Sequence, residues 1–327
     1  MRNNCEARLE RALGNFQQKI IRVSQGLHNK NMHISVLPQE TLDFLNPQKG
    51  ETIVDATVDG GGHAVMICKK LGEGGMLVAI DEDSLLLKET FANLSKIGPK
   101  IVPINGNFRH IENLLNEEGI AKVDGVLFDF GMSSNQIENS GRGFSFDRDE
   151  PLLMTYDPNP EPEELTAYQV VNSWSEQDLA DIIFRYGEER YARRIAKAII
   201  EARKEKPVVT TYELKKIIED SVPAGYREGK IHPATRTFQA IRIAVNDELN
   251  AVREGLVGAW QVLSPQGRLV AISFHSLEDR IVKHFLKDKH LSGEGALLTK
   301  KPNIAGEKET SQNRRARSAK LRAITKK

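Results

Sequence analysis

The segment TIVDATVDGGGHAVM, residues 52–66, places acidic side chains next to bare backbone. An apolar run ends at Asp55, and three glycines, 60–62, follow shortly before His63. Glycines between a strand and a helix permit a tight turn and let a ligand approach the backbone closely. The spacing therefore predicts a ligand-binding turn with carboxylates at its rim.

A second acid, Asp81, ends the next apolar run, where an acid can hold the ribose hydroxyls of a nucleotide cofactor. Two cofactor classes then compete, a dinucleotide such as NAD and S-adenosylmethionine. Asp55 and Asp59 would repel a pyrophosphate at short range, whereas they suit a sulfonium and an ammonium group. The G-x-G-x-x-G pattern is also incomplete, since His63 follows the glycines directly. The sequence favours S-adenosylmethionine over NAD.

Three further side chains stand where they could reach a ligand. His63 begins a helix and is assigned a binding role rather than that of a general base. Phe108 follows the third apolar run and either stacks on an adenine or packs in the core, two readings that stay open. Asp129 ends the fourth run in VLFDFGMSSNQ, where it either contacts the cofactor, accepts hydrogen bonds from an amine being methylated, or caps a turn.

These residues sit at the ends of apolar runs that resemble buried parallel strands. The runs are 53–58, 76–80, 101–104, 126–130 and 269–274. Helical patterns separate the first four, which predicts βαβ units and an α/β fold with a doubly wound, mostly parallel sheet. Ligands of such sheets bind beyond the carboxyl ends of the strands, so the candidate residues should converge there.

The chain divides into four predicted segments. They are a weakly patterned N-terminal extension (1–31), the first part of the core (32–136), an inserted, mostly helical domain (137–234), and the rest of the core with a basic tail (235–327). Capping boxes are expected at Ser175 with Asp178 and at Thr210 with Glu213.

The return to the core, residues 234–263, has the apolar spacing of one long helix. A polar row of Gln239, Arg242 and Asn246 lies on its shoulder, where side chains either face a substrate or brace the site. The alternation in 319–323 predicts an edge strand with a basic outer face. Eight basic residues between Lys308 and Lys327 make this tail the best candidate for attracting phosphate.

Composition narrows the class of protein. Basic and acidic residues nearly balance, 46 against 45, so no global field marks a nucleic-acid binder. The two cysteines, Cys5 and Cys68, lack the spacing of a zinc site or a disulfide framework, and no apolar run reaches the length of a membrane span. A soluble, cytoplasmic protein is predicted, with no metal and no covalent enzyme intermediate.

From His33 onward the chain resembles the bacterial small-subunit (16S) rRNA cytosine-N4 methyltransferases, the RsmH/MraW family. The matching motifs, in chain order, are GGGHA, VAIDED, NGNF, DFGMSSNQ, RGFSF, YGEERYARRIAKAI, HPATRTFQAIRIAVN, ISFHSLEDRIVK and NRRARSAKLRA. The resemblance implies a class I S-adenosylmethionine-dependent methyltransferase core with an inserted helical domain, often as a homodimer. It implies methylation of the exocyclic N4 amine of a cytidine near the decoding site of the small ribosomal subunit, with the base unstacked into a pocket.

The resemblance also assigns the site residues. The implied cofactor contacts are Gly61, Gly62, His63, Asp81, Phe108, Asp129 and Gln136, of which Gln136 rests on the resemblance alone. Asp129 is the candidate for orienting the amine. The candidate substrate contacts are Arg142, Gln239, Arg242, Asn246 and His275, although a structural hydrogen bond is the alternative for His275.

Three positions depart from the family's pattern. Asp59 stands where a glycine is usual, and Leu153 and Thr155 replace an acid and an arginine. These departures support one alternative from another class, a family member with weak or no activity that binds RNA in ribosome assembly. An NAD-dependent oxidoreductase is the other alternative.

Overall fold

The computed structural model describes residues 35–132, 136–137, 140–161 and 163–327. The predicted extension at 1–31 lies outside the described residues. The remainder forms two compact units, a helical unit within 134–246 and a core unit made of the described residues up to 132 together with 247–327. The helical unit thus ends at Asn246, where the sequence pattern had suggested 234. No helix in the described ranges combines the length and the apolar character needed to cross a bilayer.

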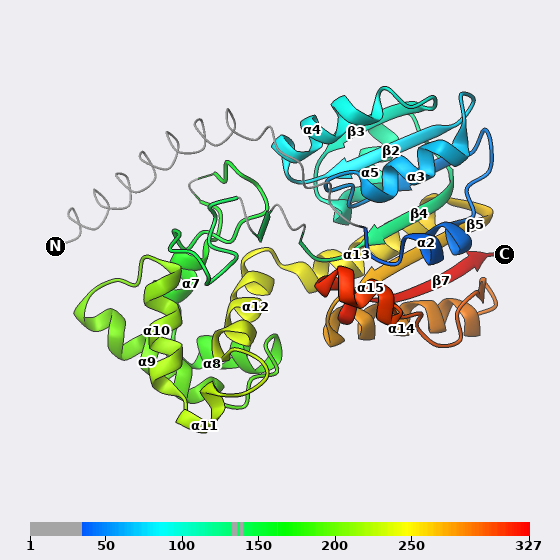
Figure 1. The fold of residues 1–327 in the computed structure, drawn as a ribbon. Coiled ribbons are helices and arrows are strands. Elements are labelled where there is room, and N and C mark those ends of the chain that lie inside the picture. The colour runs from blue at the N-terminus through cyan, green and yellow to red at the C-terminus, as the bar shows by residue number, and fades with distance from the viewer. Residues whose placement is uncertain (1–34, 133–135, 138–139, 162) are drawn as a thin grey trace. The chain divides into compact units, whose positions relative to one another are not determined.

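The core unit contains one seven-stranded sheet (Figure 1). Its strands are β1 (Thr52–Asp55), β2 (Met76–Asp81), β3 (Lys100–Asn105), β4 (Val123–Asp129), β5 (Leu263–Ser273), β6 (Gly295–Leu297) and β7 (Lys320–Lys326), in the order β3-β2-β1-β4-β5-β7-β6. The first five are mutually parallel, and β7 runs antiparallel to both β5 and β6. The predicted doubly wound sheet is confirmed.

Helices cover both faces of this sheet. One set comprises α2 (Pro38–Leu45), α3 (Gly62–Leu71) and α4 (Ser84–Leu94), and the other comprises η1 (Phe108–His110), α5 (Ile111–Glu117), α13 (Glu248–Val262) and α14 (Ser276–Leu291). Successive strand residues point to opposite faces, so Ile53 packs with the first set and Val54 with the second. Both faces are therefore buried, which explains why the strands appear in the sequence as continuous apolar runs.

The helical unit consists of α7 (Ala167–Ser173), α8 (Glu176–Arg185), α9 (Ala192–Glu205), α10 (Thr211–Ser221), α11 (Ala224–Arg227) and α12 (Pro233–Val245). The capping box of Thr210 and Glu213 is present at α10. At α8, the Ser175 hydroxyl accepts the Asp178 amide and donates to its carboxylate, so the cap is made without the reciprocal bond to the backbone. The two predicted helix starts are confirmed.

The prediction of one long helix over 234–263 is wrong. The segment forms α12 and α13, separated by Asp247 in the left-handed region with φ 47°. The Asn246 side chain accepts the Tyr156 amide and donates to the Met154 carbonyl, which holds the backbone at the break. Apolar periodicity continues across the break, and therefore could not reveal it.

The predicted edge strand is also corrected. β7 lies inside the sheet, because β6 pairs along its outer side. Of its basic face, Arg322 is buried and bonds Asp279 at 2.7 Å, and Lys320 lies 3.3 Å from the same carboxylate. These cations are bound within the protein, so they are poor candidates for attracting phosphate.

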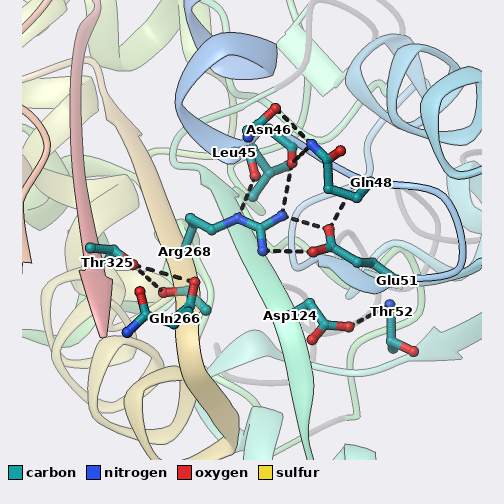
Figure 2. A network of polar contacts seen from close by, with 10 residues as sticks. Leu45, Asn46, Gln48, Glu51, Thr52, Asp124, Gln266, Arg268 and Thr325 are labelled. Atoms are coloured by element: carbon teal, nitrogen blue, oxygen red, sulfur yellow. Dashed lines mark hydrogen bonds and ion pairs between the residues drawn. The ribbon is translucent and has the colours of Figure 1, made fainter. Parts of the chain in front are cut away.

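At the amino-terminal ends of the parallel strands, one guanidinium links several segments of the core unit. Figure 2 shows Arg268 of β5 donating to both carboxylate oxygens of Glu51 and to the carbonyls of Leu45 and Asn46. Burial raises the pKa of Glu51, but the hydrogen bonds and charge of Arg268 outweigh burial and hold it below its ordinary value. Arg268 and Glu51 thus join the end of α2 to β5 and to the start of β1, two strands that are far apart in the sequence.

Replacing Arg268 by alanine should lower the free energy of unfolding by about 2 kcal/mol, because it leaves a partly buried carboxylate and two carbonyls without their donor. Urea unfolding followed by circular dichroism measures the change. Lys204→Ala, which removes an ion pair exposed on α9, is the control and should leave the transition unmoved. Equal transitions for the two variants would contradict the prediction.

Candidate cofactor site

The carboxyl ends of three neighbouring strands bring acids together. Asp55 ends β1, Asp81 ends β2 and Asp129 ends β4, and each is buried. Asp59, in the turn after β1, adds a fourth buried carboxyl. β1 ends at Asp55 rather than at Val58, so the residues from 56 onward are free to form the turn.

The turn into α3 depends on a glycine. Gly61 adopts φ 78° at the start of α3, a left-handed conformation that L side chains rarely take. A Cβ at this position would lie 2.7 Å from Cγ2 of Thr90, whose hydroxyl donates to the Asp59 carbonyl at 2.5 Å. Asp59 itself has φ 47°, so an acid occupies a conformation that favours glycine. Bare backbone at Gly61 is thus a steric requirement of the fold.

Asp81 organises the same turn. One oxygen of its carboxylate accepts the Asp59 amide and the other accepts the Asp83 amide, both at 2.8 Å. Asp83 in turn caps α4 by accepting the amides of Leu85 and Leu86. Asp81 thus fixes the backbone on both sides of the turn. Its place at the end of β2 is the one predicted.

Burial changes the acid–base properties of this cluster. The pKa of Asp55 is raised to about 7, chiefly by burial. The hydrogen bond from the Thr57 amide lowers this pKa, and the charges of Asp129 and Asp81 contribute to the increase. Burial likewise raises the pKa of Asp129 to about 7. The charge of Arg315 lowers this pKa, and the charge of Glu278 raises it. Burial, followed by the charges of Asp81 and Asp129, raises the pKa of Asp59 well above its ordinary value. Like charges crowded out of water cannot all ionise easily, so the cluster suits a cationic ligand.

Asp129 has acceptor capacity to spare. Its Oδ1 has no hydrogen-bond partner among the residues described, although the side chain is only 5% exposed. Its Oδ2 lies 3.6 Å from Nε2 of His63, which α3 places over the end of β4. His63 is thus beside the carboxylate, in keeping with the predicted binding role. Buried oxygens are normally hydrogen-bonded, so Oδ1 marks a place for a donor or a cation.

Phe108 belongs to an aromatic group at the start of η1. Its ring lies 5.5 Å from Phe128 and 5.6 Å from Phe130, and the side chain is partly buried. A Cβ at Gly255 of α13 would come within 2.7 Å of the ring. The core reading of Phe108 is therefore correct, and stacking on an adenine stays a prediction for the ring's remaining exposed part.

The polar candidates of the helical unit bond their own backbone. Arg142 is buried and donates to the carbonyls of Thr155 and Tyr156, while Gln239 donates to the Tyr186 carbonyl at 3.1 Å. Asn246 holds the break before α13, as described above. The geometry thus gives Arg142, Gln239 and Asn246 bracing roles, and their contacts to a substrate stay predictions.

The remaining candidates of this unit are less defined by contacts. Arg242 is half-buried on α12, and its carbonyl accepts the Asn246 amide. The Gln136 carbonyl accepts the Ser140 hydroxyl at 2.6 Å. Leu153 and Thr155, which depart from the family's pattern, are both buried in this unit.

His275 caps a helix. Its Nδ1 accepts the Glu278 amide, and the Glu278 carboxylate accepts the amides of Phe274 and His275. Glu248 lies nearby, so one potential ligand atom from each of Glu248, His275 and Glu278 falls within 4.8 Å of the others. The hydrogen bonds account for His275 as the N-cap of α14, which was the structural alternative.

Sequence reasoning missed Arg315. It lies on η2 (Arg314–Arg317), far along the chain from the glycines, yet its charge acts on both Asp59 and Asp129. The only signal in the sequence was its place in NRRARSAKLRA, whose several arginines are indistinguishable by type.

Comparison with known proteins decides the family. A model of the MraW methylase family matches residues 30–327. The chain belongs to the MraW methylase family. It is 44% identical over 309 residues to the ribosomal RNA small subunit methyltransferase H of Brevibacillus brevis, covering 90% of this chain and 98% of that protein. It is 46% identical over 307 residues to the protein of the same name from Syntrophotalea carbinolica, covering 89% and 97%.

Membership in the MraW methylase family settles the cofactor. The family consists of S-adenosylmethionine-dependent methyltransferases, and the sheet is that of the class I fold, so the dinucleotide alternative is wrong. The site of this MraW methylase fits the cofactor, since the orphaned Oδ1 of Asp129 and the buried carboxyls suit its two cationic groups. Asp81 offers acceptors for ribose hydroxyls, and Gly61 leaves the turn bare.

The raised pKa values predict how stability depends on pH. Between about pH 4 and pH 7 the folded protein retains protons on Asp55 that the unfolded chain loses, so ionisation progressively destabilises the unliganded fold. Asp55→Asn should therefore be more stable than the unaltered protein by a margin that grows from pH 4 to above pH 7, to about 4 kcal/mol, and then stays level. Urea unfolding at each pH measures the margin, and a margin constant over this range would contradict the prediction.

Proposed function

We propose that this MraW methylase transfers the methyl group of S-adenosylmethionine to the exocyclic N4 amine of a cytidine in small-subunit (16S) ribosomal RNA, near the decoding site. The observation that carries the proposal is Asp129, a buried carboxylate with a free acceptor at the end of β4, in a member of this family. The names of the relatives, methyltransferases of small-subunit ribosomal RNA, support the acceptor.

The residues of the site divide into binding and orienting groups. We assign cofactor binding to Gly61, Gly62, His63, Asp81, Phe108, Asp129 and Gln136. The lone pair of an aromatic amine is delocalised into the ring, so the amine attacks only when acceptors hold its N–H groups and turn the lone pair toward the methyl. Asp129 accepts one of those N–H groups through Oδ1. The bound cofactor supplies an electrophilic methyl, and the reaction needs no covalent attachment of the base to the protein.

Substrate recognition belongs to the helical unit and to His275. Arg142, Gln239 and Asn246 act chiefly by holding the surfaces that meet the RNA, because their donors already serve the protein's own backbone. Arg242 is assigned to contact the RNA. The methylase acts in the cytoplasm on the small ribosomal subunit, as a homodimer. Analytical ultracentrifugation of the full chain tests the dimer separately.

The deciding experiment incubates the full chain with tritiated S-adenosylmethionine and small ribosomal subunits that lack cytidine N4 methylation. Nucleosides of the digested RNA are then separated. Label in N4-methylcytidine is the expected result. Label in another nucleoside would overturn the assigned reaction, and an active relative run on the same subunits controls for their quality.

One further outcome separates the alternative function. Cofactor binding and ribosomal RNA binding without any label would identify an RNA-binding family member that has lost turnover. Leu153→Asp with Thr155→Arg is then the informative variant, since it restores the residue types that the family's pattern has at these two positions. Recovery of activity would assign the loss to those departures.

A further inference from the structure

Arg315 stands apart from its neighbours in η2. Arg314 and Arg317 are exposed, whereas Arg315 is half-buried. The Asn313 side chain accepts the Arg315 amide at 3.1 Å, and Ala316 is buried in the core cluster that includes α3 and β5. The cap and the buried alanine fix the direction of the short helix, and this direction turns one arginine inward.

The inward guanidinium contacts the ends of two neighbouring strands. It donates to the carbonyl of Met132, shortly after β4, and it lies 5.3 Å from the ring centroid of Phe274, directly after β5. β4 and β5 pair side by side, with Asp129 opposite Ile272. Arg315 therefore contacts the segments that follow two paired strands, and one of these strands, β4, ends at Asp129.

The charge of Arg315 acts on this carboxylate. His63 from α3 lies 3.6 Å from Asp129, and charges interact with Asp129 from Glu278 in α14, Asp55 and Asp59 in β1 and its turn, and Arg315 in η2. Burial and Glu278 favour the neutral acid, and the guanidinium opposes them. Arg315 opposes burial in the same way at Asp59. A permanent cation here favours the ionised form of a carboxyl that burial beside other acids disfavours.

We propose that Arg315 is a positioning residue, whose guanidinium holds the backbone at Met132, after β4, and supplies a counter-charge that favours the carboxylate form of Asp129. The inference rests on the proposed function only in taking S-adenosylmethionine as the cofactor. It does not depend on which molecule accepts the methyl group. The proposal gives the segment before β7 a role in the site. The charge of Arg315 acts there on Asp59 in the glycine turn and on Asp129 at the end of β4.

The test measures cofactor affinity across pH. Full-length protein and its variants are titrated with S-adenosylmethionine by calorimetry between pH 5.5 and pH 9. The α-amino group of the ligand titrates in the same way in every series, so differences between variants report the protein. Arg315→Gln removes the charge, Arg315→Lys keeps the charge without the planar fork, and Arg317→Gln is the matched control from the exposed side of η2.

Arg315→Gln should shift the midpoint of the pH dependence upward by about one unit, which is about a tenfold loss of affinity at pH 7. Arg315→Lys should keep the midpoint and lose affinity only a few-fold at every pH, because the cation remains while the bond to Met132 is weakened. Arg317→Gln should change neither quantity.

Two outcomes would overturn the inference. An unmoved midpoint in Arg315→Gln would show that Asp129 needs no counter-charge from this residue. If that variant does not fold, Arg315→Lys decides, since a midpoint shifted by a full unit despite the retained charge would contradict the electrostatic role. Because the readout is cofactor binding, these results stand whether or not ribosomal RNA proves to be the acceptor.

Discussion

Asp129→Asn is expected to lower the rate constant of methyl transfer at saturating substrates about a hundredfold or more, and to weaken S-adenosylmethionine binding at least tenfold because the charge is lost at every pH. The amide keeps the size of the side chain but replaces a charged acceptor by a weaker, neutral one. Loss of a single preorganised group at a reacting centre has an effect of about this size. Single-turnover kinetics with labelled cofactor, combined with calorimetry of cofactor binding, separates the two quantities.

Asp124→Asn provides the matched control at the other end of the same strand. Asp124 accepts the Thr52 amide at 2.9 Å, at the amino-terminal ends of the parallel strands. Its replacement shows how an Asp→Asn change elsewhere in β4 affects the rate of methyl transfer, and this rate should not change. If Asp129→Asn instead weakened cofactor binding a hundredfold and left the rate at saturation intact, Asp129 would serve the cofactor alone.

Gly61→Ala should combine a loss of stability with a loss of cofactor affinity. The added Cβ must be accommodated at φ 78° and would meet Thr90 at 2.7 Å, which breaks or displaces the bond from Thr90 to the Asp59 carbonyl. The left-handed backbone alone costs about 1 kcal/mol, and steric crowding adds about 1 to 3 kcal/mol. We expect the free energy of unfolding to fall by about 3 kcal/mol and cofactor affinity to fall at least tenfold, because Asp59 and the Asp81 carboxylate move with the turn.

Gly50→Ala isolates the backbone contribution. Gly50 has a similar φ of 84°, but a Cβ there would find nothing within 4 Å. It should cost about 1 kcal/mol of stability and leave cofactor binding unchanged. Urea unfolding and calorimetry of both variants give the comparison. Equal losses in the two variants would show that Thr90 yields without cost and that the turn is less crowded than its geometry implies.

Much of the fold could be predicted because the relevant signals are local. Strands buried on both faces must be apolar throughout, so β1 to β4 were recognisable as runs that end in Asp55, Asp81 and Asp129. The cap at Thr210 was recognisable because its two partners lie within one turn of helix. The position of the candidate site followed from the general geometry of parallel sheets.

The errors have a common physical cause. The break at Asp247 depends on bonds from Asn246 to residues 154 and 156, and periodicity does not register such partners. β7 was assigned to an edge because the short strand β6 has almost no pattern of its own. Periodicity could not indicate either that Arg142 bonds the carbonyls of residues 155 and 156, and its contact with a substrate stays a prediction.

The amino-acid sequence by itself determined the family, the parallel sheet and the acids at its strand ends, since these depend on residue types and spacings. Only the tertiary structure decided the burial of those acids, the charges around them and hence their pKa values. Burial raises the pKa of Asp129 to about 7, and Arg315, from the other end of the chain, opposes that change. Charge and desolvation act through space rather than along the chain, so the chemistry of the site appears only when distant segments have been brought together.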